Sequence, residues 1–223
     1  MKSFSRTPEM TGDGTFTLYI PEIDEHYHSV NGAGVEAEHV YVKEALLHHG
    51  GTEVSVLEVG FGTGLNAFLT LLKSMETGMK VHYTTLELYP LDPEQVEKLN
   101  YPEKIAPAFE DFFRALHTAP WNEPVEITPE FILEKRNCDL VGSELEGAFD
   151  VVYFDAFAPD KQSEMWSDAI YRKVVGRMNP QGVMTTYCAK GVVRRGWQGA
   201  GLTMERIPGP PGKREMIRGT KRA

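Results

Sequence analysis

The segment Glu58-Val59-Gly60-Phe61-Gly62-Thr63-Gly64-Leu65-Asn66 decides how the surrounding chain folds. An apolar run at 54–57 precedes it and another at 67–72 comes after it, which predicts a strand, a glycine turn and a helix. Glycines at alternate positions let the backbone approach a ligand closely, and the free N–H groups that open the helix favour polar or anionic ligand groups. We therefore expect a nucleotide-like cofactor at this turn.

The spacing of the glycines argues against one common cofactor. A turn that holds a dinucleotide pyrophosphate needs G-x-G-x-x-G, with an acidic residue about 20 positions further on. The glycines here have the spacing G-x-G-x-G and residue 65 is leucine. An NAD-dependent oxidoreductase is therefore disfavoured, while a purely structural strand-to-helix connection stays open for the turn taken alone.

Length and composition favour one cytoplasmic catalytic unit. The 223 residues fit a single domain spanning 1–223, and the first eight residues lack the apolar core of a signal peptide. No later segment is long and apolar enough to cross a membrane, so we expect no membrane partner. Cys138 and Cys188 have neither metal-type nor disulfide-type spacing and are expected to be ordinary thiols.

Charge is distributed unevenly along the chain. The formal net charge is −9, yet from residue 190 onward nine lysines and arginines accompany only two glutamates. A basic end on an acidic body can still dock a phosphate backbone, because the local potential decides docking. Charge by itself equally fits a solvated surface.

The order of predicted elements is that of an α/β protein with a mostly parallel sheet. Prolines interrupt the helical pattern of 89–124, which predicts several short helices in an insertion that caps the sheet. The expected elements are a hairpin within 14–34 and a helix at 35–48 (the N-terminal region 1–50), strand 54–59, helix 65–75, strand 80–86, the cap 89–124, strands 125–134 and 149–154, helix 163–178, strand 183–187, helix 192–200 and a final antiparallel hairpin of 203–206 with 215–218.

Three acidic residues come after predicted strands, where ligand-binding side chains gather in open α/β sheets. Glu87 ends the strand after the glycine turn and suits the two hydroxyls of a ribose, since a carboxylate accepts several hydrogen bonds. Asp139 suits an adenine amino group, although it also reads as a loop acid. Asp155 comes after a near-continuous apolar run, where an unpaired buried acid would be costly. It therefore needs a partner, and a ligand amine is a good candidate.

The loop after this last strand reads Asp155-Ala156-Phe157-Ala158-Pro159. Its Phe157 and Pro159 are candidates to form the wall of a pocket and to stack on a flat base, with ordinary core packing as the alternative. Orienting an amine towards an electrophilic carbon is the main service that a carboxylate provides in a direct transfer.

Other catalytic classes find little support. His26, His28 and His39 lie close in sequence, but no set of acidic ligands accompanies them, so no metal site is expected. The chain has neither a G-x-S-x-G elbow nor a P-loop, which disfavours hydrolases and phosphotransferases.

Taken together, the motifs resemble the methyltransferase part of the MnmC family, which completes 5-methylaminomethyl-uridine at the wobble position of tRNA. The resemblance spans nearly the whole chain and includes standalone members of the MnmD type. It is carried by His28-Ser29 through Glu36, Val40-Tyr41, the turn at 58–66, Leu88-Tyr89-Pro90-Leu91, the loop 155–159 with Met165-Trp166, Gly191-Val192-Val193-Arg194-Arg195-Gly196, and Lys213-Arg214-Glu215-Met216.

The resemblance implies a Rossmann-like class I methyltransferase fold that uses S-adenosylmethionine and acts on tRNA. It makes Asp155 the catalytic aspartate, while Ala156 departs from the glycine that is frequent in the family's loop and is expected to narrow the pocket. The expected cofactor-binding residues are Glu58, Gly60, Gly62, Gly64, Asn66, Glu87 and Asp139, and the expected substrate-binding residues are Phe157, Pro159, Lys190, Arg194, Arg195, Lys213 and Arg214.

The expected reaction is N-methylation of 5-aminomethyl-(2-thio)uridine to 5-methylaminomethyl-(2-thio)uridine, without the FAD-dependent oxidase step of two-part members. A separate enzyme would then prepare the aminomethyl group. Two alternatives remain at this point: a methyltransferase of the same fold acting on a small amine or a protein, and a non-catalytic module that binds a cofactor or RNA.

Overall fold

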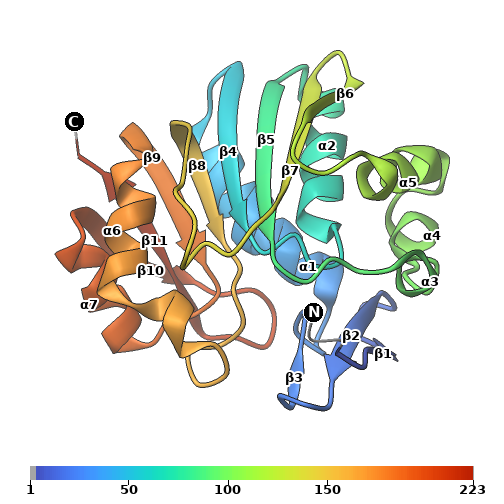
Figure 1. The fold of residues 1–223 in the computed structure, drawn as a ribbon, viewed down its shortest axis with the longest axis horizontal. Coiled ribbons are helices and arrows are strands. Elements are labelled where there is room, and N and C mark those ends of the chain that lie inside the picture. Colours follow the sequence, from blue (N-terminus) through green and yellow to red (C-terminus); the bar gives the residue numbers. More distant parts are fainter. Residues whose placement is uncertain (1–3, 223) are drawn as a thin grey trace.

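The computed structural model describes residues 4–222; residues 1–3 and 223, which include both ends of the predicted domain, lie outside the described part. Its main feature is an eight-stranded sheet in the order β10-β11-β9-β8-β4-β5-β7-β6 (Figure 1). The predicted mostly parallel α/β sheet is confirmed. The parallel strands are β4 (Glu53–Val59), β5 (Lys80–Glu87), β7 (Phe131–Asn137), β8 (Phe149–Phe154) and β9 (Met178–Thr186), and the antiparallel ones are β6 (Pro124–Thr128), β10 (Leu202–Pro208) and β11 (Glu215–Lys221).

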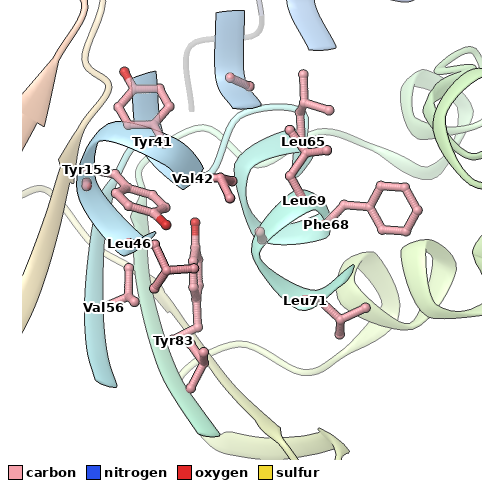
Figure 2. Packing of buried hydrophobic residues seen from close by; sticks show 14 of the residues in the cluster. Tyr41, Val42, Leu46, Val56, Leu65, Phe68, Leu69, Leu71, Tyr83 and Tyr153 are labelled. Carbon is pink, nitrogen blue, oxygen red and sulfur yellow. The ribbon is translucent and has the colours of Figure 1, made fainter. Parts of the chain in front are cut away.

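Helices cover both faces of the sheet, so its central strands are buried on both sides. Along β4, Val54 and Val56 belong to one hydrophobic cluster, whereas Leu57 and Val59 belong to the other. Figure 2 shows the first cluster, in which Tyr41 approaches Tyr153 and the helix after the glycine turn packs alongside. This face carries α1 (Ala33–Ala37), the π-helix η1 (Glu38–Leu47) and α2 (Leu65–Thr77), and the opposite face carries α6 (Asp168–Gly176) and α7 (Gly191–Gly199).

The N-terminal region forms a small separate sheet, dark blue in Figure 1. It consists of β1 (Thr7–Met10), β2 (Phe16–Ile20) and β3 (Glu25–His26). A strand was expected within 14–34, and β2 confirms it, but β2 pairs with β1 and β3. Residues 29–32 form a turn that leads into α1. Asp13 explains this course, because its carboxylate accepts hydrogen bonds from the amides of Thr15 and Val35 and so joins the β1–β2 turn to the helix start.

The helix expected at 35–48 begins at Ala33 and adopts π-type hydrogen bonding from Glu38 to Leu47. Stretches of π-helix are rare and occur frequently at functional sites. Tyr41 lies in this stretch, and its side chain is buried.

The segment 89–124 contains the expected short helices: α3 (Pro93–Val96), α4 (Tyr101–Ile105), the 3₁₀ turn η2 (Pro107–Phe109) and α5 (Glu110–Thr118). Prolines lie in the first turns of three of them, where a missing N–H costs nothing. Lys135 of β7 holds this insertion to the sheet. Its buried ammonium donates to the carbonyl of His117 at 2.7 Å and lies 4.6 Å above the ring of Trp121.

Three further elements are divided or begin elsewhere than expected. The strand expected at 125–134 is two antiparallel strands, β6 and β7, because the chain turns at Pro129 and Glu130. The helix expected at 163–178 breaks at Ser167, which caps α6 and leaves the 3₁₀ turn η3 (Ser163–Trp166) before it. β9 begins at Met178, since the register shift opposite β8 accommodates Pro180 in the strand.

The C-terminal hairpin is confirmed, with strands longer than expected. Across residues 4–222, the helices are all too short or too polar to span a bilayer.

Candidate active site

Two adjoining cavities lie at the carboxyl ends of the parallel strands. The central cavity has a volume of about 270 Å³ and the side cavity about 260 Å³. Five residues line both: Tyr27, His28, Asp155, Ala156 and Phe157. Asp155 therefore lies where contents of the two cavities would meet.

A larger cavity of about 840 Å³ lies against the helical insertion and shares only Phe61 and Gly62 with the central cavity. Asp155 does not line it, so size alone does not identify the chemically important site.

The glycine turn forms one wall of the central cavity. The amides of Gly60 and Phe61 both donate to the carbonyl of Leu86, which joins the turn to the end of β5. Gly60 has φ of 95°, and a Cβ at this position would lie 2.9 Å from the carbonyl oxygen of Asp155. Only glycine allows the turn to pass this close to the Asp155 loop.

Glu87 fixes the second wall. One carboxylate oxygen accepts the Gly62 amide at 2.9 Å, and the other accepts the Tyr89 amide at 2.7 Å. A carboxylate has about four lone-pair directions, so this group can accept further hydrogen bonds on the cavity side. The two backbone contacts orient it for that purpose.

Asp155 is held by hydrogen bonds from two distant segments. Its Oδ1 accepts from the Tyr41 hydroxyl at 2.5 Å, and its Oδ2 accepts from the Asn66 amide nitrogen at 2.8 Å. Burial raises the pKa of Asp155 to about 6, although both hydrogen bonds act in the opposite direction. The carboxyl group is thus largely ionised at neutral pH and close to its titration range.

The loop after Asp155 is anchored at three backbone groups. The Tyr187 hydroxyl donates to the carbonyl of Ala156 at 2.9 Å, and the Trp166 indole donates to the carbonyl of Phe157 at 2.7 Å. Gln162 accepts the amide of Phe157 at 3.2 Å. Trp166 of the Met165-Trp166 motif therefore helps to hold the loop in position.

The N-terminal segment crosses the central cavity. The Arg6 guanidinium donates to the Tyr27 hydroxyl, to Gln95 of the insertion and to the carbonyl of Tyr89. The Tyr27 ring in turn meets Phe157 edge to face at 5.1 Å. Sequence reasoning assigned no site role to Arg6, Tyr27 or Tyr41. Tyr41 lies in a segment that carries the resemblance, but no local pattern indicates which distant groups these three side chains contact.

One side of the side cavity is closed by an ion pair. Lys213 contacts the carboxylate of Glu36, and its ammonium lies 4.6 Å from the ring centre of Tyr187. Glu36 also accepts the Ser29 amide at 2.7 Å. These contacts connect the C-terminal hairpin loop to the start of the first helix.

The structure gathers most, not all, of the predicted site residues. Glu58 is buried behind the central cavity, Gly64 caps α2 against His117, and Pro159 lines neither cavity. The predicted residues that line the central cavity are Gly60, Gly62, Asn66, Glu87, Asp139, Asp155 and Phe157.

The predicted basic residues fall into two groups. Lys190 pairs with Asp160 at 2.5 Å, and Lys213 pairs with Glu36. Arg194, Arg195 and Arg214 form no ion pair with any residue in the described range 4–222. Arg195 and Arg214 are exposed, whereas Arg194 is half-buried.

The three N-terminal histidines have different partners. His26 pairs with Glu9, His39 contacts the carbonyl of Pro208, and His28 lines the cavities beside Thr63. Within the part of the chain that the structure describes, no cluster of three potential metal ligands is present. Both cysteines are free thiols, and Cys138 lines the central cavity.

Comparison with known proteins finds one matching family and several similar curated proteins. Residues 134–222 match a family described as S-adenosyl-L-methionine-dependent methyltransferase. The "tRNA 5-methylaminomethyl-2-thiouridine biosynthesis bifunctional protein MnmC" of Cupriavidus metallidurans is 30% identical, over 94% of this chain and 33% of its own length. The MnmC protein of Magnetococcus marinus is 28% identical, over 97% of this chain and 35% of its own. The chain thus spans about a third of these curated relatives.

Among solved structures, MNMC2 from Aquifex aeolicus matches with a TM-score of 0.80 and 20% identity, covering all of this chain and 72% of that one. Spermidine synthase from Thermotoga maritima matches with a TM-score of 0.54 and 11% identity, over 99% of this chain and 82% of that one. At these identities the likeness concerns the fold.

Proposed function

We propose, from the premise that this chain belongs to the MnmC-type family of S-adenosylmethionine-dependent methyltransferases, that it methylates 5-aminomethyl-(2-thio)uridine at the wobble position of tRNA. One observation carries the proposal: Asp155 lines both cavities. A cofactor in one and an amine in the other would meet at a single carboxylate. The relatives' name, which refers to tRNA 5-methylaminomethyl-2-thiouridine, supports the choice of substrate.

The central cavity suits S-adenosylmethionine. Gly60 and Gly62 let the turn pass close to Asp155 and Tyr27 without side chains of its own, and Glu87 retains lone pairs for ribose hydroxyls. Asp139 lies on the same cavity and suits the adenine amino group. When bound, S-adenosylmethionine supplies an electrophilic methyl group on a sulfonium centre.

Asp155 has two tasks in this scheme. An aminomethyl group is mostly protonated in water, and an ammonium has no lone pair with which to attack. The ionised Asp155 attracts it and accepts one of its protons, which leaves a neutral amine aligned for transfer. A pKa of about 6 keeps the carboxylate available as a base at neutral pH.

Aromatic side chains would hold the base. Tyr27 and Phe157 line both cavities and contact each other edge to face. Stacking on such rings accommodates an unpaired base taken out of a folded RNA. For the phosphates, the best candidates are Arg194, Arg195 and Arg214, since Lys190 and Lys213 are already paired with carboxylates.

The proposed substrate also defines which chemistry must precede the reaction. Another activity has to supply the aminomethyl group on the uridine. Action on tRNA would place the protein in the cytoplasm.

Replacing Asp155 tests the catalytic role. We expect Asp155→Asn to reduce single-turnover methylation of aminomethyl-uridine tRNA by about 10²–10⁴-fold, because the base is lost. Calorimetry with S-adenosylhomocysteine should show cofactor binding retained. Asp111→Asn, an exposed change on α5, is the matched control. Full activity of Asp155→Asn would refute the assignment.

Two further measurements separate tRNA from other substrates. Nucleoside mass analysis of tRNA from cells lacking this chain should show aminomethyl-uridine accumulating. Purified protein should transfer methyl groups to that tRNA in preference to small amines or proteins. An unchanged nucleoside profile, together with transfer to small amines, would favour a methyltransferase of another specificity.

A further inference from the structure

A second carboxyl group lies directly behind Asp155. Glu58, near the end of β4, is 0% exposed, and the strand register sets it between Thr85 of β5 and Tyr153 of β8. Its Oε2 accepts the Thr85 hydroxyl at 2.6 Å, whereas its Oε1 has no hydrogen-bond partner. Among the described residues no cation forms an ion pair with it.

An ionised carboxylate in this position would be costly. Removing a charge from water without a counter-ion costs several kcal/mol, and a buried acid avoids the cost by keeping its proton. The ionised Asp155 nearby adds a like charge. Burial accordingly raises the pKa of Glu58 well above its ordinary value.

Asn66 lies next to both carboxyl groups. Its amide nitrogen donates to Asp155 Oδ2 at 2.8 Å, while its Oδ1 is buried without a partner. The hydroxyl of Tyr83, which also faces Glu58, is the third unpartnered atom in this cluster. A protonated Glu58 supplies the donor that Asn66 Oδ1 lacks, so one proton gives a partner to both Glu58 Oε1 and Asn66 Oδ1.

We propose that Glu58 is a neutral carboxylic acid that donates its proton to Asn66 Oδ1 and thereby fixes the amide that holds Asp155. Glu58 is then a positioning residue, not a cofactor ligand. Without this donor the Asn66 side-chain amide can rotate by about 180° and place its Oδ1 against Asp155 Oδ2, and these two acceptor oxygens would repel each other. The catalytic consequence rests on the proposed function, but the protonation of Glu58 does not.

Other groups that influence the pair are known from the structure. Tyr83 and Tyr153 face Glu58 from β5 and β8. On the other side, Tyr41 contacts Asp155, and the remaining charges that act on Asp155 are Glu36 and Lys213, which pair with each other. No cation from these elements offsets an ionised Glu58.

The test compares Glu58→Gln with Glu58→Leu by carboxyl ¹³C NMR titration of the full chain. Glutamine has the charge and the donor of a protonated glutamate, so the titration midpoint of Asp155 should stay at its wild-type value. Leucine removes the donor, so the Asp155 midpoint should rise. Thr70→Val, which deletes a buried hydroxyl that contacts Tyr153 at 3.1 Å, should leave the midpoint unchanged.

A downward shift of the Asp155 midpoint in Glu58→Gln would overturn the proposal, because it would mean that a negative charge had been removed. An ordinary glutamate titration by Glu58 in the wild type would do the same. If Glu58→Leu does not fold, these two results still decide the question.

Activity provides a second readout. With aminomethyl-uridine tRNA, kcat should be about tenfold higher for Glu58→Gln than for Glu58→Leu, the effect of one hydrogen bond, with similar cofactor binding. Expected titrations without any tRNA methylation would count against the proposed function and leave the state of Glu58 standing. Equal kcat in both variants would exclude the positioning role.

Discussion

At the scale of the residue, Asp155 has a pKa close to neutral pH and a carboxylate that is fixed in orientation. Tyr41 and Asn66 donate to separate oxygens, so the carboxylate cannot rotate without losing a hydrogen bond. Burial raises its pKa to about 6, from 3.8. Because the folded state binds this proton more tightly, the contribution of Asp155 to stability falls as pH rises through that interval.

The Tyr41 hydroxyl should control the pH dependence of activity. In the proposed mechanism the ionised form of Asp155 is the active one, so kcat/KM should fall as pH falls through about 6. Tyr41→Phe removes a hydrogen bond that favours ionisation, so the acid limb should move to higher pH. Rates measured between pH 5 and 9 test this, with Tyr19→Phe, remote on β2, as the control. An unmoved limb would show that the hydroxyl does not act on Asp155.

At the scale of the element, the strand-turn-helix unit of β4 and α2 holds the site together. Its glycine turn bonds to the end of β5 through Leu86 and Glu87, and it passes close to the Asp155 loop. The carboxyl ends of neighbouring parallel strands thus lie at the same edge of the sheet, and the loops that follow them line the central cavity.

Gly60→Ala should damage both stability and cofactor binding. The new Cβ would lie 2.9 Å from a backbone oxygen, and φ of 95° is unfavourable for alanine, so we expect a loss of about 1–3 kcal/mol in unfolding free energy. Gly199→Ala is the control, since it meets open space at the end of α7 and should be neutral or slightly stabilising. Denaturant unfolding and calorimetry with S-adenosylhomocysteine measure both effects; equal behaviour of the two variants would refute the packing argument.

At the scale of the whole molecule, chain segments far apart in sequence complete the site. The N-terminal Arg6 segment crosses the central cavity, and the Lys213–Glu36 pair closes the side cavity. The chain is acidic overall, but its residues from 190 onward, which include α7 and the C-terminal hairpin, are basic. This basic region lies on the opposite side of the sheet from α5 (Figure 1).

Removing the unpaired arginines should weaken tRNA binding in a salt-dependent way. The triple variant Arg194→Ala, Arg195→Ala, Arg214→Ala should bind more weakly, and the slope of log affinity against log salt should decrease by about 1 for each phosphate that an arginine no longer neutralises. Arg114→Ala on α5, where Arg114 pairs with Glu110, should change neither quantity. Filter binding at several salt concentrations measures both. An unchanged slope would assign docking to another surface.

Local pattern was enough to predict the α/β class, the glycine turn, Glu87 and the Asp155 loop, because each depends on apolar periodicity and on the residues directly after a strand. The short turn at Pro129 and Glu130 was not predicted, since apolar residues lie on both sides of it and the whole segment was read as one strand. Nor did the π-helical stretch at 38–47 have a signal in the periodicity.

Sequence by itself determined where the parallel strands end and hence which loops form the cavities, since hydrophobic pattern and glycine spacing act over a few residues. Tertiary structure alone decided the partners of each polar group. Tyr41 lies 114 residues from Asp155, and Lys213 lies 177 residues from Glu36. Burial, counter-ions and pKa depend on such distant contacts, so only the fold could reveal that Glu58 lies behind Asp155 and that two of the predicted basic residues are already paired.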